Sequence, residues 1–103
     1  MPDKLTDRFA DALQYTFELF GRDARKSSTV PVLAHLINVC AIVQQDGGSE
    51  DEAIAALLHD TLEDKPGEVT EEEISARFGE NVARMVRIAT DTVPEWIGGV
   101  KPP

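Results

Sequence analysis

A chain of 103 residues is the size of one domain and too short for two ordinary ones. Hydrophobic residues make up 42% of it and charged residues 28%, values that exclude a disordered chain and a membrane protein. Nineteen acidic residues against ten basic ones give a net charge of −9, so we expect neither a nucleic acid nor an anionic membrane as the main partner. The charged N-terminus MPDKLTDRFADAL lacks the apolar stretch of a signal peptide, and we expect a cytoplasmic protein.

The apolar residues recur at helical spacing along the whole chain, which predicts an all-α bundle of about five helices. A first helix carries an apolar stripe over residues 5–20 and ends at Gly21. A second helix runs from Pro31 to about Gln45 and is apolar on most sides, so we expect it to be central and largely buried. The helical domain is expected to span residues 3–92, followed by an extended tail over 93–103.

Two capping boxes mark the start of later helices. Ser49 with Glu52 opens a third helix, which we expect to cover the segment EDEAIAALLHDTLED before KPGEV breaks it. Thr70 with Glu73 opens a short fourth helix that ends at a glycine. A fifth helix is predicted from about residue 81 to 90.

The single cysteine, Cys40, excludes an internal disulfide and any zinc site built on several cysteines. It lies inside the apolar run VLAHLINVCAIV, where no basic residue is near. We therefore expect a buried, unreactive thiol.

The two histidines lie in the most apolar helices, where an imidazole costs free energy unless it forms a hydrogen bond or binds a metal. In the segment LLHDTLED, Glu63 lies one helical turn after His59, and Asp64 one turn after Asp60. Together with His35 on a neighbouring helix, this group suits a divalent cation such as manganese, iron, zinc or magnesium. The alternative is that the histidines are hydrogen-bonded core residues and the two later carboxylates face solvent.

Four segments, PVLAHLINVCAIV, AIAALLHDTLED, EEEISARFGENVARMV and IATD, closely resemble the HD superfamily of metal-dependent phosphohydrolases. The resemblance covers about residues 5–92 and is closest to the alarmone (guanosine tetraphosphate) hydrolase domain of RelA/SpoT-type proteins. It implies an HD-type helical bundle. It also implies an enzyme that removes the 3′-pyrophosphate from guanosine tetra- or pentaphosphate, usually with manganese.

The resemblance further implies roles for individual residues. His35, His59 and Asp60 would ligate the metal. The acidic pair Glu63 and Asp64 would position and activate the attacking water. The chemistry is coherent, because a metal lowers the pKa of bound water and a nearby carboxylate can take up its proton.

Substrate contacts and the last metal ligand are the points at which the sequence departs from the family. Arg25 and Lys26 match the basic pair that faces the nucleotide or its phosphates. The fourth metal ligand of the family is an aspartate in a phrase such as ADKLHN, which this sequence does not contain, and Asp91 does not correspond to it. We therefore expect a truncated or shortened HD domain, whose exposed apolar core is covered by a second copy in a homodimer or swapped assembly.

Two other classes of function stay open at this point. One is a non-catalytic HD-fold module that serves in binding or oligomerisation, and the other is a purely structural helical bundle. Manganese-dependent release of pyrophosphate distinguishes the enzyme from the module. Stoichiometric metal binding distinguishes the module from the bundle.

Overall fold

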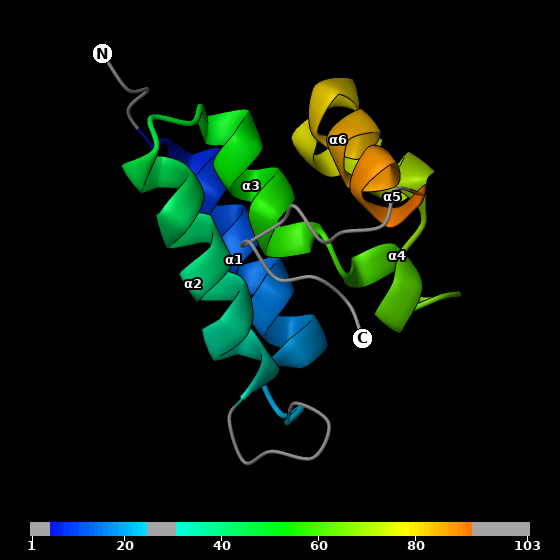
Figure 1. Ribbon diagram of the computed structural model, residues 1–103. Helices are drawn as coiled ribbons and strands as arrows, with labels where there is room; N and C mark the ends of the chain where they lie inside the picture. The colour runs from blue at the N-terminus through cyan, green and yellow to red at the C-terminus, as the bar shows by residue number, and fades with distance from the viewer. Residues whose placement is uncertain (1–4, 25–30, 92–103) are drawn as a thin grey trace.

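The computed structural model describes residues 5–24 and 31–91, and the regular structure within these ranges is helical (Figure 1). The helices are α1 (Asp7–Phe20), α2 (Val32–Gln45), α3 (Glu50–Leu58), α4 (Thr61–Asp64), α5 (Glu71–Phe78) and α6 (Glu80–Asp91). The described residues form isolated bridges but no strand, which confirms the predicted all-α bundle. The predicted tail over 93–103 lies outside the described residues.

Helix α3 is the centre of the bundle. It packs against α1 and α2 on one side and against α6 on the other, and α5 packs against α6 (Figure 1). Residues 53–58 of α3 are all buried, and Ile54, Leu57 and Leu58 are 0% exposed. Burying one such side chain contributes about 1.5–3 kcal/mol to the free energy of unfolding. The contacts of α3 therefore hold the neighbouring helices in place.

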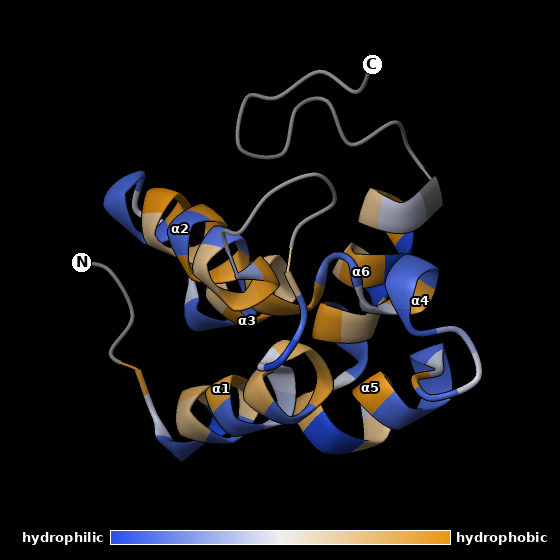
Figure 2. Ribbon diagram, turned by 90° about the horizontal axis from the view of Figure 1, so that it is seen from below, coloured by the Kyte–Doolittle hydropathy of each residue, from blue (hydrophilic) through white to orange (hydrophobic). Residues whose placement is uncertain are grey.

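The expectation that α2 is central and largely buried is wrong. Leu36, Val39 and Cys40 are buried, but Ile37 is 46% exposed, and α2 is apolar well beyond the face that it buries (Figure 2). The reason is that α3 occupies the central position, so α2 is covered on one side only. Cys40 is nevertheless buried as predicted, and burial raises the pKa of its thiol, which keeps it protonated and unreactive.

The helix starts are confirmed by their hydrogen bonds. Ser49 and Glu52 form the reciprocal capping box of α3, and the Thr70 hydroxyl accepts a hydrogen bond from the Glu73 amide at the start of α5. Gly79 ends α5 with a φ of +105°, a conformation that favours glycine. Short polar side chains therefore set the boundaries that the sequence indicated.

The predicted third helix is wrong in one respect, because it breaks in two. Helix α3 ends at Leu58, and the one-turn helix α4 begins at Thr61. Asp60 between them has φ −95° and ψ −2°, and the Thr61 hydroxyl donates to the carbonyl of Leu58 at 2.7 Å. The turn at residues 59–60 redirects the chain where the proposed ligands lie, a feature that helical periodicity cannot predict.

A charged network at the N-terminal end of α3 ties the four helices α1, α3, α5 and α6 together. The Arg8 guanidinium donates to Glu50 at 3.1 Å, to Asp51 at 2.8 Å and to the carbonyl of Phe78. The Asn81 amide donates to the second oxygen of Asp51 at 3.0 Å. The hydrogen bonds from Asn81 and then from Arg8 lower the pKa of Asp51 below 3.8.

Replacing Asn81 by Ala is therefore expected to lower the free energy of unfolding at pH 7 by about 1 kcal/mol. The native state stabilises the ionised form of Asp51, so this contribution is fully present above pH 3.8 and is lost as the pH falls through the lowered pKa. Urea unfolding at pH 7 and at pH 2.5 measures the change. Asn38→Ala, at an exposed position of α2, is the control, and a difference for Asn81→Ala that is no smaller at pH 2.5 than at pH 7 would contradict this role.

Candidate metal centre

Three of the sequence-predicted residues converge at the end of α3. His35 comes from α2, and His59 and Asp60 come from the turn after α3. One potential ligand atom from each side chain lies within 4.8 Å of the other two. His59 is buried, whereas His35 and Asp60 are half-buried, so the group lies at the edge of the core and remains open to solvent on one side.

The hydrogen bonds of His59 orient its ring. Its Nδ1 lies 2.7 Å from the carbonyl oxygen of Ala56. A carbonyl only accepts hydrogen bonds, so Nδ1 carries a proton and donates it. The opposite nitrogen, Nε2, lies 3.2 Å from Oδ1 of Asp60. Nε2 thus faces the carboxylate and the ring of His35, whose centroid is 5.9 Å away.

This donor set fits a divalent transition metal. Two imidazoles and a carboxylate suit manganese, iron and zinc. Atoms bound to one ion at about 2.1 Å lie at most about 4.2 Å apart, so the three ligands need only a small approach to share an ion. The carbonyl that holds Nδ1 of His59 is the kind of outer contact that fixes a metal-binding imidazole.

A cavity of about 690 Å³ opens beside this cluster. Its described lining consists of Phe20, Arg22, Asp23, Ala24, Val32, His35, Asp60 and Asp64. The volume is in the range of small-molecule sites. The structure thus places a pocket of the right size directly against two of the three metal-binding candidates.

The two members of the predicted acidic pair differ in their relation to the cavity. Both residues are exposed, but Asp64 lines the cavity and Glu63 is not among the described lining residues. Partial burial, together with the negative charges of Asp60 and Glu63, raises the pKa of Asp64 above 3.8. The Asp64 carboxylate therefore takes up a proton more readily than an ordinary aspartate does.

Replacing Asp64 by Asn is expected to raise the Tm of the metal-free protein by about 1–3 °C. At pH 7 the ionised carboxylate costs more in the native state than in the unfolded chain, because its native pKa is raised. The gain should vanish below pH 3.8, where Asp64 is protonated in both states. Calorimetric melting measures it, with the exposed Asp11→Asn as control, and a lower Tm for Asp64→Asn would contradict the effect.

Other predicted residues are not placed by the structure, and one pairing was missed. Arg25 and Lys26 lie outside the described residues, as does the side chain of Asp91. Lys65, directly after the acidic pair, donates to Asp23 at 2.8 Å across 42 residues. No local pattern signals this contact, since it depends on how α4 returns toward the end of α1.

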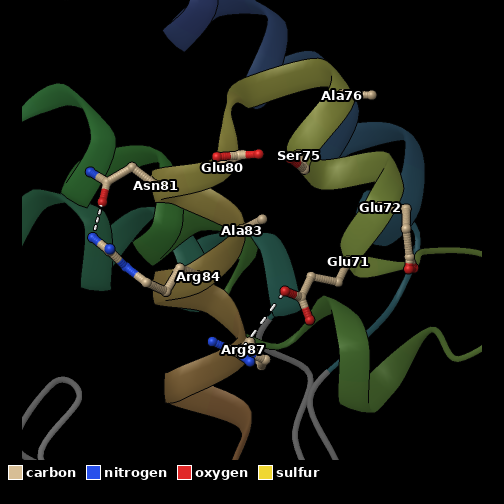
Figure 3. Close-up of a pocket in the computed structure, with 9 residues that line it drawn as sticks. All are labelled: Glu71, Glu72, Ser75, Ala76, Glu80, Asn81, Ala83, Arg84 and Arg87. Atoms are coloured by element: carbon tan, nitrogen blue, oxygen red, sulfur yellow. Dashed lines mark hydrogen bonds and ion pairs between the residues drawn. The ribbon is translucent and has the colours of Figure 1, made fainter.

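A larger hollow of about 830 Å³ between α5 and α6 lacks comparable chemistry (Figure 3). Its two arginines have partners on the same surface: Arg84 bonds to Asn81, and Arg87 lies 3.8 Å from Glu71. Its described lining contains no histidine or cysteine. We therefore assign the functional site to the cavity of about 690 Å³ that His35 and Asp60 line.

Comparison with known proteins decides the family. The sequence model of the HD domain family matches residues 12–93 of the chain, a range that includes His35, His59 and Asp60. The chain belongs to the HD domain family. This confirms the resemblance of the sequence, and with it the HD-type fold.

Relatives within the HD domain family point to one branch. A guanosine-3′,5′-bis(diphosphate) 3′-pyrophosphohydrolase of Aquifex aeolicus is 42% identical over 79 residues, which cover 77% of this chain and 11% of that protein. The pyrophosphohydrolase MESH1 of Xenopus tropicalis is 37% identical over 90 residues, covering 82% and 49%. A solved metazoan ortholog of SpoT, described as hydrolysing ppGpp, superposes with a TM-score of 0.72 at 31% identity, covering 82% of this chain and 48% of that one.

This HD domain spans about half or less of the length of these relatives. None of the helices in its described part is long and apolar enough to cross a bilayer.

Proposed function

We propose that this chain is a metal-dependent phosphohydrolase that removes the 3′-pyrophosphate from guanosine tetra- or pentaphosphate. The observation that carries the proposal is the convergence of His35, His59 and Asp60 beside a cavity, in a chain that belongs to the HD domain family. The activity for which these relatives are named supports the substrate class. The products would be guanosine di- or triphosphate and pyrophosphate.

The three clustered residues would hold the divalent ion, which we propose is Mn²⁺. When bound there, the ion would supply Lewis-acid polarisation and water activation near neutral pH. The hydrogen bond from Nδ1 of His59 to Ala56 keeps Nε2 directed at the ion site. The half-buried Asp60 would contribute one charged ligand oxygen.

The acidic pair would handle the attacking water. Asp64, with its raised pKa and its place in the cavity, would accept the proton of that water at its carboxylate. Glu63, exposed beside it, would help to orient the water. Arg25 and Lys26 would offset the charge of the substrate phosphates, a role that rests on the resemblance alone.

The proposal is tested by incubating metal-stripped protein with guanosine tetraphosphate and measuring released pyrophosphate. We expect release that requires added Mn²⁺ and stops with excess EDTA. No release at saturating Mn²⁺ would reject the enzyme. Stoichiometric metal binding without release would favour the alternative, a non-catalytic HD-fold module.

The proposed assembly is a homodimer. An apolar groove of about 330 Å³ lies between α2, α3 and α6, and its lining includes Val39, Ile42 and Met85. Apolar surface of this kind is typical of association sites. Sedimentation at several protein concentrations tests the dimer, and a monomer throughout would contradict it. The cytoplasmic location remains a prediction from the sequence.

A further inference from the structure

The cavity beside the metal centre carries an excess of negative charge for a site that must accept a polyphosphate. Its described lining includes Asp23, Asp60 and Asp64, and Arg22 is the one arginine or lysine among those described lining residues. Asp60 belongs to the proposed metal cluster, and Asp64 lies beside it. A divalent ion would offset these two carboxylates, which leaves the charge of Asp23 to be balanced.

Lys65 balances Asp23. Its Nζ lies 2.8 Å from Oδ2 of Asp23 and 5.2 Å from the centre of the Phe20 ring, which is 1% exposed. The hydrogen bond from Lys65 to Asp23 raises the pKa of the ammonium, so the lysine stays charged. The carboxylate of Asp23 is therefore neutralised by the ammonium group of Lys65, a residue that is not among the described lining residues of the cavity.

Backbone hydrogen bonds of Asp23 fix the position of the main chain from which the Arg22 side chain extends. The amide of Asp23 donates to the carbonyl of Phe20 at 2.9 Å, and the carbonyl of Asp23 accepts from the amide of Val32 at 3.0 Å. Val32 begins the helix that carries His35. These bonds tie the segment that carries Arg22 to the same helix that supplies a metal-binding candidate.

Arg22 itself has no ion pair with any other described residue. Its side chain is exposed and lines the cavity. A guanidinium in this position offers several donors to a phosphate group in a fixed planar arrangement. An adjacent free carboxylate at residue 23 would compete for those donors, and Lys65 removes that competition.

We propose that Arg22 binds a phosphate group of the anionic substrate, and that Lys65 is a positioning residue that keeps Arg22 available by neutralising Asp23. The inference rests on the proposed function for its substrate. It adds a substrate-binding residue and a charge relation that neither the family resemblance nor the relatives supply. The Lys65 side chain is 19% exposed and that of Asp23 is 42% exposed, so the pair lies at the edge of the surface and its loss should lower the stability only modestly.

The test compares Arg22→Met, Lys65→Met, Asp23→Asn and the double variant Lys65→Met/Asp23→Asn in Mn²⁺-dependent hydrolysis of guanosine tetraphosphate. Arg22→Met should raise KM about tenfold, with kcat changed less than about twofold. Lys65→Met should raise KM about threefold, and the double variant should return to the wild-type KM, because no free carboxylate remains at residue 23. Arg87→Met, which removes an exposed arginine in the hollow between α5 and α6, is the matched control and should leave KM unchanged.

The double variant separates electrostatics from structure. If the ion pair served only to hold the backbone around Asp23 in place, the double variant would be as impaired as Lys65→Met, and that result would overturn the role of Lys65. An Arg22→Met variant with the KM of Arg87→Met would overturn the role of Arg22. Melting temperatures of all variants should agree with the wild type within a few degrees.

A binding experiment distinguishes failure of the proposed hydrolase function from failure of the proposed anion site. Inorganic pyrophosphate is titrated into the Mn²⁺-loaded protein, with no turnover involved. Arg22→Met should weaken pyrophosphate binding about tenfold and Arg87→Met should not. Wild-type binding of pyrophosphate without hydrolysis of guanosine tetraphosphate would reject the substrate but keep the anion site, whereas absence of wild-type binding would overturn the anion site itself.

Discussion

Replacing Asp60 by Asn is expected to lower kcat/KM for guanosine tetraphosphate at least about a thousandfold. Asp60 supplies the carboxylate of the cluster that it forms with His35 and His59, and its Oδ1 lies 3.2 Å from Nε2 of His59. An amide keeps the size of the side chain but loses the charge that attracts a divalent ion. Pyrophosphate release at saturating Mn²⁺ measures the loss.

The fold should survive this substitution, because the Asp60 side chain is 27% exposed and lies in a turn rather than in the core. Circular dichroism and melting should show a folded Asp60→Asn protein. The exposed Asp11→Asn is the matched control and should keep full activity. Hydrolysis by Asp60→Asn within about tenfold of the wild type would mean that the cluster is not the catalytic metal site.

Replacing Asp64 by Asn is expected to lower kcat by about a hundred- to ten-thousandfold, the usual contribution of a proton-transfer group. Asp64 lines the cavity, and its pKa is raised by partial burial and by the charges of Asp60 and Glu63. Manganese affinity should change much less than kcat, since Asp64 is not one of the three clustered residues. Rates at saturating substrate, together with metal titrations, separate the two effects.

Glu63→Gln is the informative comparison for Asp64→Asn. Glu63 is outside the described lining of the cavity, to which Asp64 belongs, so the loss of Glu63 should lower kcat less than the loss of Asp64. A larger loss of kcat for Glu63→Gln than for Asp64→Asn would assign the proton transfer to Glu63 instead. The two variants should bind Mn²⁺ with equal affinity. The difference in kcat then reports on proton transfer from the attacking water and not on loss of the metal ion.

Local signals in the sequence predicted most of the fold. Capping residues such as Ser49 and Thr70 indicate where a helix begins, because their hydroxyl groups accept hydrogen bonds from backbone amides in the first turn. The burial of α2 was overestimated, since hydrophobicity alone does not determine which of two apolar helices is central. The central place belongs to α3, in which residues 53–58 are all buried.

The metal cluster could be anticipated from the resemblance to the HD superfamily, whereas a histidine beside a carboxylate in an apolar helix is by itself a weak signal. The turn at Asp60 could not, because it depends on tertiary packing around Thr61, which is fully buried. The Lys65–Asp23 pair likewise joins residues that are 42 positions apart. The charge balance of the cavity therefore became visible only in three dimensions.

Calorimetric titration of Mn²⁺ into the metal-stripped protein is the most direct test of the central claim. We predict one site per chain with a dissociation constant on the order of micromolar, and loss of that binding in Asp60→Ala. Such a result would support a metal centre built on His35, His59 and Asp60. Absence of binding, or equal binding by the wild type and Asp60→Ala, would contradict it.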